Sequence, residues 1–105
     1  MAEKLTGGAR AEALAGMPDW RFDEEREGIA RSFRFRDFNE AFAFMTRVAL
    51  AAERADHHPE LSNVWSIVEI FLTTHSAGGF TAKDAALAKR IDAFAASLAL
   101  PRRAD

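Results

Sequence analysis

The sequence predicts an α+β protein with two layers, in which an antiparallel sheet of about four strands is covered on one face by two long helices, with a short helix before them. Two periodicities lead to this prediction. Apolar and polar residues alternate over 29–36, as in a half-buried strand. Over 38–55 and 87–98 apolar residues recur every three or four positions, as in amphipathic helices. Short segments rich in charge or glycine separate these runs and favour hairpin connections.

Length and composition indicate one domain. The chain has 105 residues and is 49% hydrophobic, so we expect residues 1–105 to form one unit with a core at 17–98 and flexible ends at 1–5 and 101–105. The absence of cysteine excludes disulfides, thiolate metal sites and cysteine nucleophiles. A net charge of −2 argues against nucleic-acid binding. No apolar run is long enough to span a membrane, and residues 1–8 lack the apolar core of a signal peptide. We therefore expect a cytoplasmic protein.

The first elements are short. Residues 9–15 are strong helix formers, with Thr6 as a candidate N-cap and Gly16 as a candidate stop. A strand is expected over 19–22, followed by a charged turn over 23–28. In the next strand, 29–36, one face of the alternation holds these four residues: Ile29, Arg31, Phe33 and Phe35.

The first long helix is predicted to follow Asp37, which forms a capping-box pattern with Glu40, and to run about 18 residues to Ala55. We expect its phenylalanines to lie in the core. The apolar stripe predicted to cover the sheet consists of Phe38, Ala41, Phe42, Met45, Val48, Ala49 and Ala52.

Residues 61–74 are predicted to be extended. Alternation assigns Val68, Ile70, Leu72 and Thr74 to the helix-covered face and Trp65, Ile67, Glu69, Phe71 and Thr73 to the other. An outer face with three large apolar groups suggests a pocket or a subunit contact. Fourteen residues are long for one strand, so a bulge or break is expected near Ser66.

The last predicted elements are a turn and a helix. Gly78 and Gly79 mark the turn, and Thr81 with Asp84 forms a second capping box. The helix that follows is predicted to end at Pro101.

All three histidines fall between positions 53 and 75. His57 and His58 are adjacent, and Pro59 restricts the backbone after them, so the pair should lie on a defined bend. A run of β-branched and apolar residues then leads to His75. Imidazole exchanges protons near neutral pH. The segment therefore indicates a pocket with several proton-transfer groups.

These residues also form a motif that resembles a known family. The motif is Glu53-x3-His57-His58-Pro59, an aromatic at Val64-Trp65, Leu72-x-Thr74-His75 and Gly78-Gly79-x-Thr81-x2-Asp84. It resembles the pterin-4a-carbinolamine dehydratases over residues 18–92. The resemblance implies the same two-layer fold and an enzyme, a dehydratase (carbon–oxygen lyase). Its substrate would be a 4a-hydroxytetrahydrobiopterin-type carbinolamine, converted to quinonoid dihydropterin during tetrahydropterin recycling. It further implies a homodimer or homotetramer, no cofactor, and a functional link to an aromatic amino acid hydroxylase.

The resemblance also implies roles for individual residues. His57, His58 and His75 would be the active-site histidines, with proton transfer assigned to His57 and His75 and substrate orientation to His58. Glu53 matches an acidic position of the family and could orient an imidazole, although a solvated helix-end carboxylate explains it equally well. The remaining implied binding residues are Pro59 and Trp20, as walls for the pterin, and Asp84, near the pocket. Core packing competes for Trp20, and for Asp84 we favour the helix cap.

The same residues also fit other functions less well. Glu53 and the three histidines could supply zinc ligands, but adjacent histidines on a proline-locked bend seldom converge on one ion, so we expect no metal. No Gly-x-Ser-x-Gly elbow or phosphate-binding glycine loop is present. A non-enzymatic binding module of the same fold, acting as a dimerisation or transcriptional cofactor, is the alternative, and the intact histidines favour the enzyme. Trp65 and Leu61 depart from the residues common in the family and leave the natural pterin open.

Overall fold

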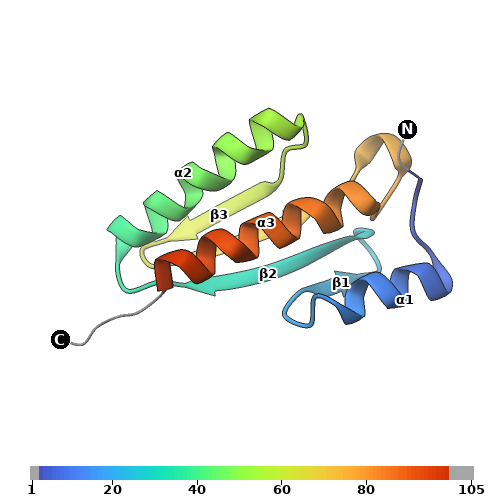
Figure 1. The fold of residues 1–105 in the computed structure, drawn as a ribbon, viewed down its shortest axis with the longest axis horizontal. Coiled ribbons are helices and arrows are strands. Elements are labelled where there is room, and N and C mark those ends of the chain that lie inside the picture. Colours follow the sequence, from blue (N-terminus) through green and yellow to red (C-terminus); the bar gives the residue numbers. More distant parts are fainter. Residues whose placement is uncertain (1–2, 100–105) are drawn as a thin grey trace.

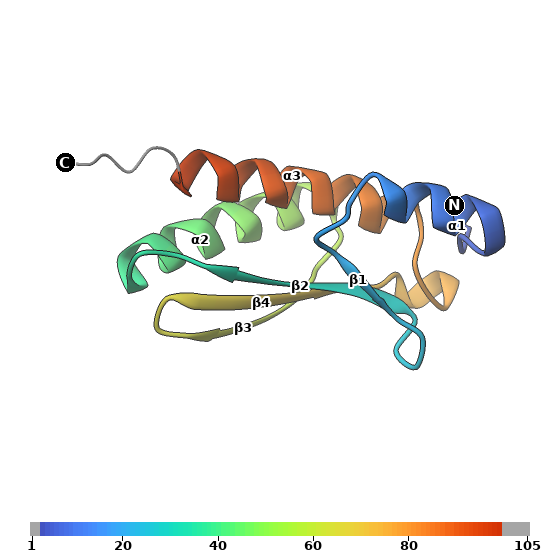
Figure 2. The same cartoon turned by 90° about the horizontal axis from the view of Figure 1, so that it is seen from below.

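A computed structural model describes residues 3–99. The elements are α1 (Gly7–Ala15), β1 (Arg21–Asp23), β2 (Gly28–Arg34), α2 (Phe38–Ala55), β3 (Glu60–Val64), β4 (Ile67–Leu72), the 3₁₀ helix η1 (His75–Ala77) and α3 (Ala82–Ala99) (Figure 1). The four strands form one antiparallel sheet in the order β1-β2-β4-β3, with α2 and α3 on the same side of it (Figure 2). The predicted α+β fold with a four-stranded antiparallel sheet is thus confirmed.

The two central strands, β2 and β4, place the core. Ile29 pairs with Leu72 and Phe33 with Val68, so the apolar sides of both strands face the helices. Against them α2 contributes Phe44, whose ring centroid lies 4.8 Å from that of Phe33. From α3 the fully buried Ile91 completes the layer. The alternation predicted for residues 29–36 and 67–74 therefore sets the helix-covered face correctly.

Helix α2 has the predicted bounds, but its buried face agrees only in part with the predicted one. Asp37 accepts a hydrogen bond from the Glu40 N–H at 2.9 Å, which confirms the cap. The buried stripe, however, consists of Ala41, Phe44, Val48, Ala51 and Ala52. Phe38 and Phe42 are 48% and 56% exposed, and the prediction that they belong to the core is wrong. Apolar residues occur on more than half of the helix circumference, so the spacing alone does not determine which side faces the sheet.

The extended run over 61–74 forms a hairpin. Strands β3 and β4 pair with each other, with Val64 opposite Ile67, and the connecting residues are Trp65 and Ser66. The predicted break near Ser66 is therefore confirmed. Trp65 has a positive φ of 53° and lies 62% exposed in this turn. Consequently Trp65 belongs to the hairpin tip, not to the outer sheet face as predicted.

The N-terminal segment is more ordered than the sequence suggests. Lys4 forms an isolated antiparallel bridge with Thr81, and the Leu5 N–H donates to the Phe80 carbonyl at 2.8 Å. These contacts correct the expected flexibility of residues 3–5, because they tie the segment to the start of α3. Residues 1–2 and the predicted flexible tail at 101–105, with the stop at Pro101, lie outside the described residues.

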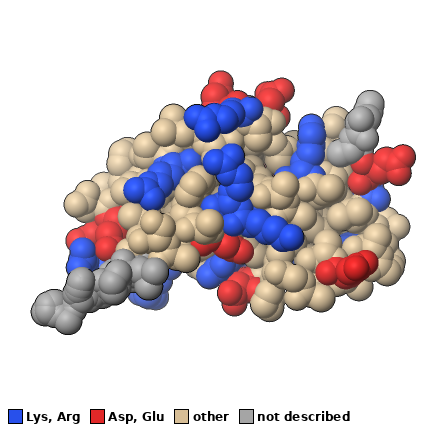
Figure 3. Space-filling view, viewed as in Figure 1, with Lys and Arg blue, Asp and Glu red and all other residues tan. Residues whose placement is uncertain are grey.

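Charged side chains are unevenly distributed over the helical side. Figure 3 shows Lys and Arg side chains grouped over the middle of this face and most Asp and Glu side chains toward its margins. In the described part of the chain, no helix has the length and apolar character needed to cross a membrane.

Candidate active site

A sharp backbone turn after α2 places the adjacent histidines. Asp56 adopts the left-handed conformation, and its N–H donates to the carbonyls of Ala52 and Glu53. The His57 N–H then donates to the Ala52 carbonyl at 3.0 Å. These bonds close the helix end. After Asp56, only His57, His58 and Pro59 lead to β3, in agreement with the predicted bend.

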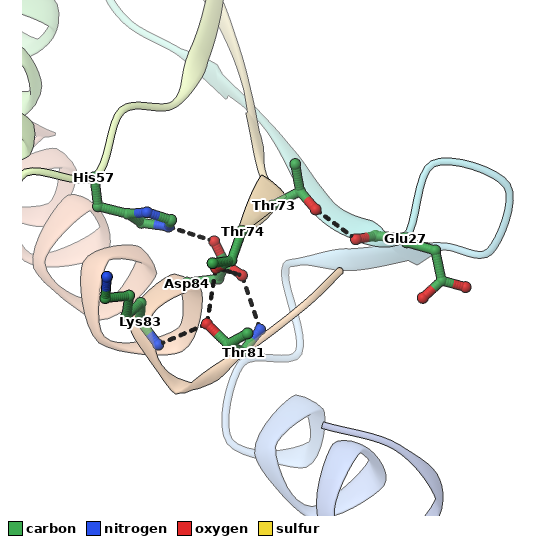
Figure 4. Close-up of polar contacts among 7 residues, drawn as sticks. All are labelled: Glu27, His57, Thr73, Thr74, Thr81, Lys83 and Asp84. Atoms are coloured by element: carbon green, nitrogen blue, oxygen red, sulfur yellow. Dashed lines mark hydrogen bonds and ion pairs between the residues drawn. The ribbon is translucent and has the colours of Figure 1, made fainter. Parts of the chain in front are cut away.

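His57 forms a buried pair with Asp84 at the start of α3. Its Nε2 lies 2.6 Å from Asp84 Oδ1, and the two residues are 9% and 0% exposed. The other carboxylate oxygen, Oδ2, accepts from the Thr81 N–H at 2.8 Å and from the Thr74 hydroxyl at 2.9 Å (Figure 4). An ionised carboxylate only accepts hydrogen bonds, so the shared proton belongs to His57 Nε2. In a neutral ring, Nδ1 is then the proton acceptor.

Asp84 forms the predicted cap and has a second role that the sequence did not indicate. It closes the capping box, because its Oδ2 accepts from the Thr81 N–H while the Thr81 hydroxyl accepts from the Lys83 N–H at 3.1 Å. The same carboxylate fixes the His57 ring with its second oxygen. The spacing of Thr81 and Asp84 predicted the cap, but no local pattern predicted the contact with His57, 27 residues away.

His58 lies at the surface with Glu53. The His58 Nε2 is 2.9 Å from Glu53 Oε1, and the two side chains are 57% and 81% exposed. Exposed pairs of this kind contribute little to stability. Glu53 is thus a solvated helix-end carboxylate that also contacts an imidazole, which combines the two interpretations given above.

His75 begins η1, directly after Thr74. It borders an open cleft of about 330 Å³, which is also lined by Arg26, Glu27, Glu60, Phe71, Thr73 and Gly78. The Thr74 hydroxyl donates to Asp84, which also bonds to His57. Two hydrogen bonds therefore connect His57 to Thr74, the residue that directly precedes His75. Thr73 faces the other way, and its hydroxyl donates to the Glu27 carbonyl at 2.7 Å (Figure 4). The two threonines that follow β4 thus face opposite sides. Thr74 supports His57 through Asp84, whereas Thr73 lines the cleft.

His57 is not among the residues that line this cleft; it borders a separate, smaller cavity, so the two histidines do not line one pocket as the sequence suggested. This cavity of about 170 Å³ lies between the end of α2 and the first turns of α3, and its walls include Ala55, Ala86 and Leu87. Lys83 and Arg90 complete its lining. The ring of His57 is therefore bonded to Asp84 and also in contact with a largely apolar space.

The two predicted pocket walls are placed differently. Trp20 is 4% exposed in the core; its indole N–H donates to Asp92 at 2.9 Å, and its ring meets Phe33 edge-on at 6.0 Å. It lines none of the cavities described above. Pro59 is half-buried between His58 and Glu60. Within the described residues, no three side chains of His, Asp or Glu converge as metal ligands would.

Several residues around the histidines were not predicted to belong to the site. Thr74 follows the inward alternation of β4 as an ordinary core position, yet its hydroxyl bonds to Asp84. Arg26 and Glu27 belong to a charged turn, and such turns are usually solvated. Glu60 follows the His-His-Pro segment directly and could have been included on position alone.

Comparisons with known proteins identify the family of the chain. The sequence model of the family described as "Pterin 4 alpha carbinolamine dehydratase" matches residues 3–94. The chain belongs to this family. A family member from Rhizorhabdus wittichii, named "Putative pterin-4-alpha-carbinolamine dehydratase", is 59% identical over 93 residues, which are 89% of this chain and 96% of that protein. A relative of the same name from Rhodopseudomonas palustris is 59% identical over 95 residues, covering 90% and 94%.

Two solved structures share the family fold. One, titled a transcriptional coactivator/pterin dehydratase from Brucella melitensis, matches with a TM-score of 0.85 and 43% identity over 89% of this chain and 99% of that one. The other is a pterin dehydratase-like protein identified as a RuBisCO assembly factor in the alpha-carboxysome. It matches with a TM-score of 0.64 and 26% identity over 73% of this chain and 89% of its own.

Proposed function

We propose that the protein is a 4a-hydroxytetrahydropterin dehydratase that acts by histidine acid–base catalysis. Family membership supports the reaction class. The observation that carries the mechanism is the buried His57–Asp84 pair, 2.6 Å long, beside the segment that presents His75 to an open cleft. An oriented imidazole backed by a carboxylate is a well-suited proton acceptor.

The reaction needs two proton transfers. The carbinolamine carries a hydroxyl on C4a and an N–H on the adjacent N5. Protonation of the hydroxyl releases water as the C4a–O bond breaks, and removal of the N5 proton lets the nitrogen electron pair form the C4a=N5 bond. One proton is taken up and one is given, so the reaction needs no external oxidant or reductant.

We assign the two transfers to different histidines. His57 is the base, because Asp84 holds its Nε2–H and stabilises the imidazolium that forms when Nδ1 takes a proton. His75, exposed at the cleft, is the acid for the departing hydroxyl. His58, at the surface, orients the substrate together with Glu53. A hydroxylase that leaves a 4a-hydroxypterin is the class of enzyme that would supply the substrate.

The alternative is a binding module that uses the same fold without catalysis. Two solved relatives favour it, because one is described as a transcriptional coactivator/pterin dehydratase and the other as a pterin dehydratase-like RuBisCO assembly factor. In that case the His57–Asp84 pair would only stabilise the fold.

A direct assay separates the two. The carbinolamine is generated in situ, and its decay to quinonoid dihydropterin is followed by absorbance with and without the protein. We expect catalytic amounts of protein to accelerate the decay well beyond the spontaneous rate. A rate equal to that of the protein-free control would contradict the dehydratase and leave the binding module.

A further inference from the structure

A second hollow adjoins the cleft of His75. It measures about 250 Å³ and lies on the outer face of the sheet, away from the helices, where it is lined by Arg21, Ala30, Ser32, Ser62 and Glu69 among others. The cleft and this groove share three residues: Arg26, Glu60 and Phe71. A single boundary therefore separates them.

The base of this boundary is fixed. Phe71 is only 7% exposed although it points to the outer face. Its ring lies over Gly28, where a Cβ would come within 2.4 Å of the ring atom Cζ. Position 28 requires glycine, because only a residue without a side chain leaves room for the Phe71 ring. The sequence suggested that Phe71 contributes to an exposed apolar surface, but the chain itself covers it.

The top of the boundary is held weakly. The Arg26 guanidinium carbon lies 3.7 Å from the centroid of the Phe71 ring, and Arg26 Nη2 lies 2.7 Å from Glu60 Oε1. Both charged side chains are about half exposed, at 48% and 56%. Ion pairs and cation–π contacts at such exposure are each worth about 1 kcal/mol or less. The Arg26 side chain can therefore move aside at little cost while Phe71 stays.

The groove suits a neutral, hydroxylated ligand. Ser32, Glu69 and Ser62 lie side by side on β2, β4 and β3, since Glu69 pairs with both serines. This row offers two hydroxyls and a carboxylate to a ligand with O–H groups. The groove is lined by three arginines (Arg21, Arg26 and Arg31) and two glutamates (Glu60 and Glu69). The Arg31 guanidinium is already paired with Asp92 at 2.7 Å, so the remaining charges balance and an anion gains little.

We propose that this groove binds the polyhydroxylated chain that a tetrahydropterin carries at C6, with the pterin ring in the cleft of His75 and the Arg26–Glu60 pair as the threshold between them. The inference rests on the proposed dehydratase function and adds the substrate's side chain to it. It assigns substrate selection to residues of the outer sheet face that no motif contains.

The test compares two carbinolamines, one with a methyl group at C6 and one with a dihydroxypropyl chain. Ser32 and Ser62 are exposed, so Ser32→Leu and Ser62→Leu fill the groove from two strands without disturbing the core. We expect each to lower the ratio of kcat/KM for the dihydroxypropyl over the methyl substrate by at least about tenfold. Ser97→Leu, at an exposed position on α3, is the matched control and should leave the ratio unchanged.

Binding of the stable dihydropterins with the same two substituents gives a readout that does not require turnover. If Ser32→Leu binds the dihydroxypropyl compound more weakly and the methyl compound equally well, the groove is the binding site of the side chain, whatever reaction the protein catalyses. An equal effect on both compounds, or none on either, overturns the inference. Absence of turnover in the unmodified protein, with intact selective binding, contradicts only the proposed function.

Discussion

Asp84 is the residue on which stability and chemistry meet. Its carboxylate caps α3, receives the Thr74 hydroxyl and holds the His57 ring, all at 0% exposure. A buried acceptor with three donors is costly to alter, because each donor would lose its partner. A change in activity at this position therefore has to be separated from a change in folding.

Asp84→Asn provides that separation. The amide oxygen can still accept from Thr81 and Thr74, but the amide N–H₂ facing His57 Nε2 would favour the opposite tautomer and place a hydrogen on Nδ1. We expect a loss of about 1–3 kcal/mol in the free energy of unfolding and a clear loss of turnover. In a His57→Gln background the stability loss should persist while the turnover loss disappears. Equal turnover penalties in both backgrounds would show that Asp84 acts only as a cap.

His58 is predicted to affect substrate binding more than chemistry. It lies 57% exposed beside Glu53, without the buried support that His57 has. His58→Gln should raise KM more than it lowers kcat, which is the pattern for contacts made equally in the ground and transition states. Steady-state kinetics on His58→Gln, with Glu53→Gln as the milder companion, tests this. A large drop in kcat at unchanged KM would move His58 into the proton-transfer step.

At the scale of elements, local sequence patterns predicted the helix caps and the buried strand faces, because these features depend on residues close together in the chain. Asp37 and Thr81 cap their helices as the spacing indicated, and alternation placed Ile29 and Val68 in the core. The side of α2 that faces the sheet was not predictable, because Phe42 and Phe44 are equally apolar and only packing chooses Phe44.

The candidate site follows the same division. The histidines and the bend at Pro59 could be found from the motif, since they lie close together in sequence. The bond between His57 and Asp84 and the shared wall at Phe71 depend on contacts between segments far apart in the chain. No single-sequence pattern contains such contacts.

Gly28 tests the packing of the β1–β2 corner against β4. An added Cβ would lie 2.4 Å from the Leu72 carbonyl oxygen, which is backbone and cannot move aside. We expect Gly28→Ala to lower the free energy of unfolding by about 1–3 kcal/mol, the usual cost of overpacking. Gly8→Ala, in α1 with nothing within 4 Å, is the control and should be neutral or stabilising by up to about 1 kcal/mol. Urea unfolding measures both, and an unchanged midpoint for Gly28→Ala would refute the close approach.

At the scale of the whole molecule, the sheet ends in an edge that invites a partner. In residues 3–99 no strand pairs with the outer edge of β3. Val64 and Trp65, at its end and in the adjoining turn, are 77% and 62% exposed, and Leu61 on the strand is 38% exposed. Exposed apolar groups along an open edge favour pairing with another chain.

We therefore predict a homodimer or homotetramer in solution. Light scattering coupled to size exclusion at micromolar concentration should give at least twice the monomer mass of 11.6 kDa. Val64→Lys, which places a charge beside the edge, should shift the mass toward the monomer if this edge is the contact. A stable monomer for the unmodified chain would contradict the prediction.

The most direct test of histidine acid–base catalysis is the dehydration rate of His57→Gln and His75→Gln, measured together with the melting temperature of each sample. Glutamine keeps hydrogen-bonding groups but does not exchange protons near neutral pH. The account predicts that turnover falls by about 10²–10⁴ in each variant. His75→Gln should melt near the unmodified protein because His75 is exposed, whereas His57→Gln should melt somewhat earlier because His57 is buried. Retention of full turnover per folded molecule by both variants would contradict the account.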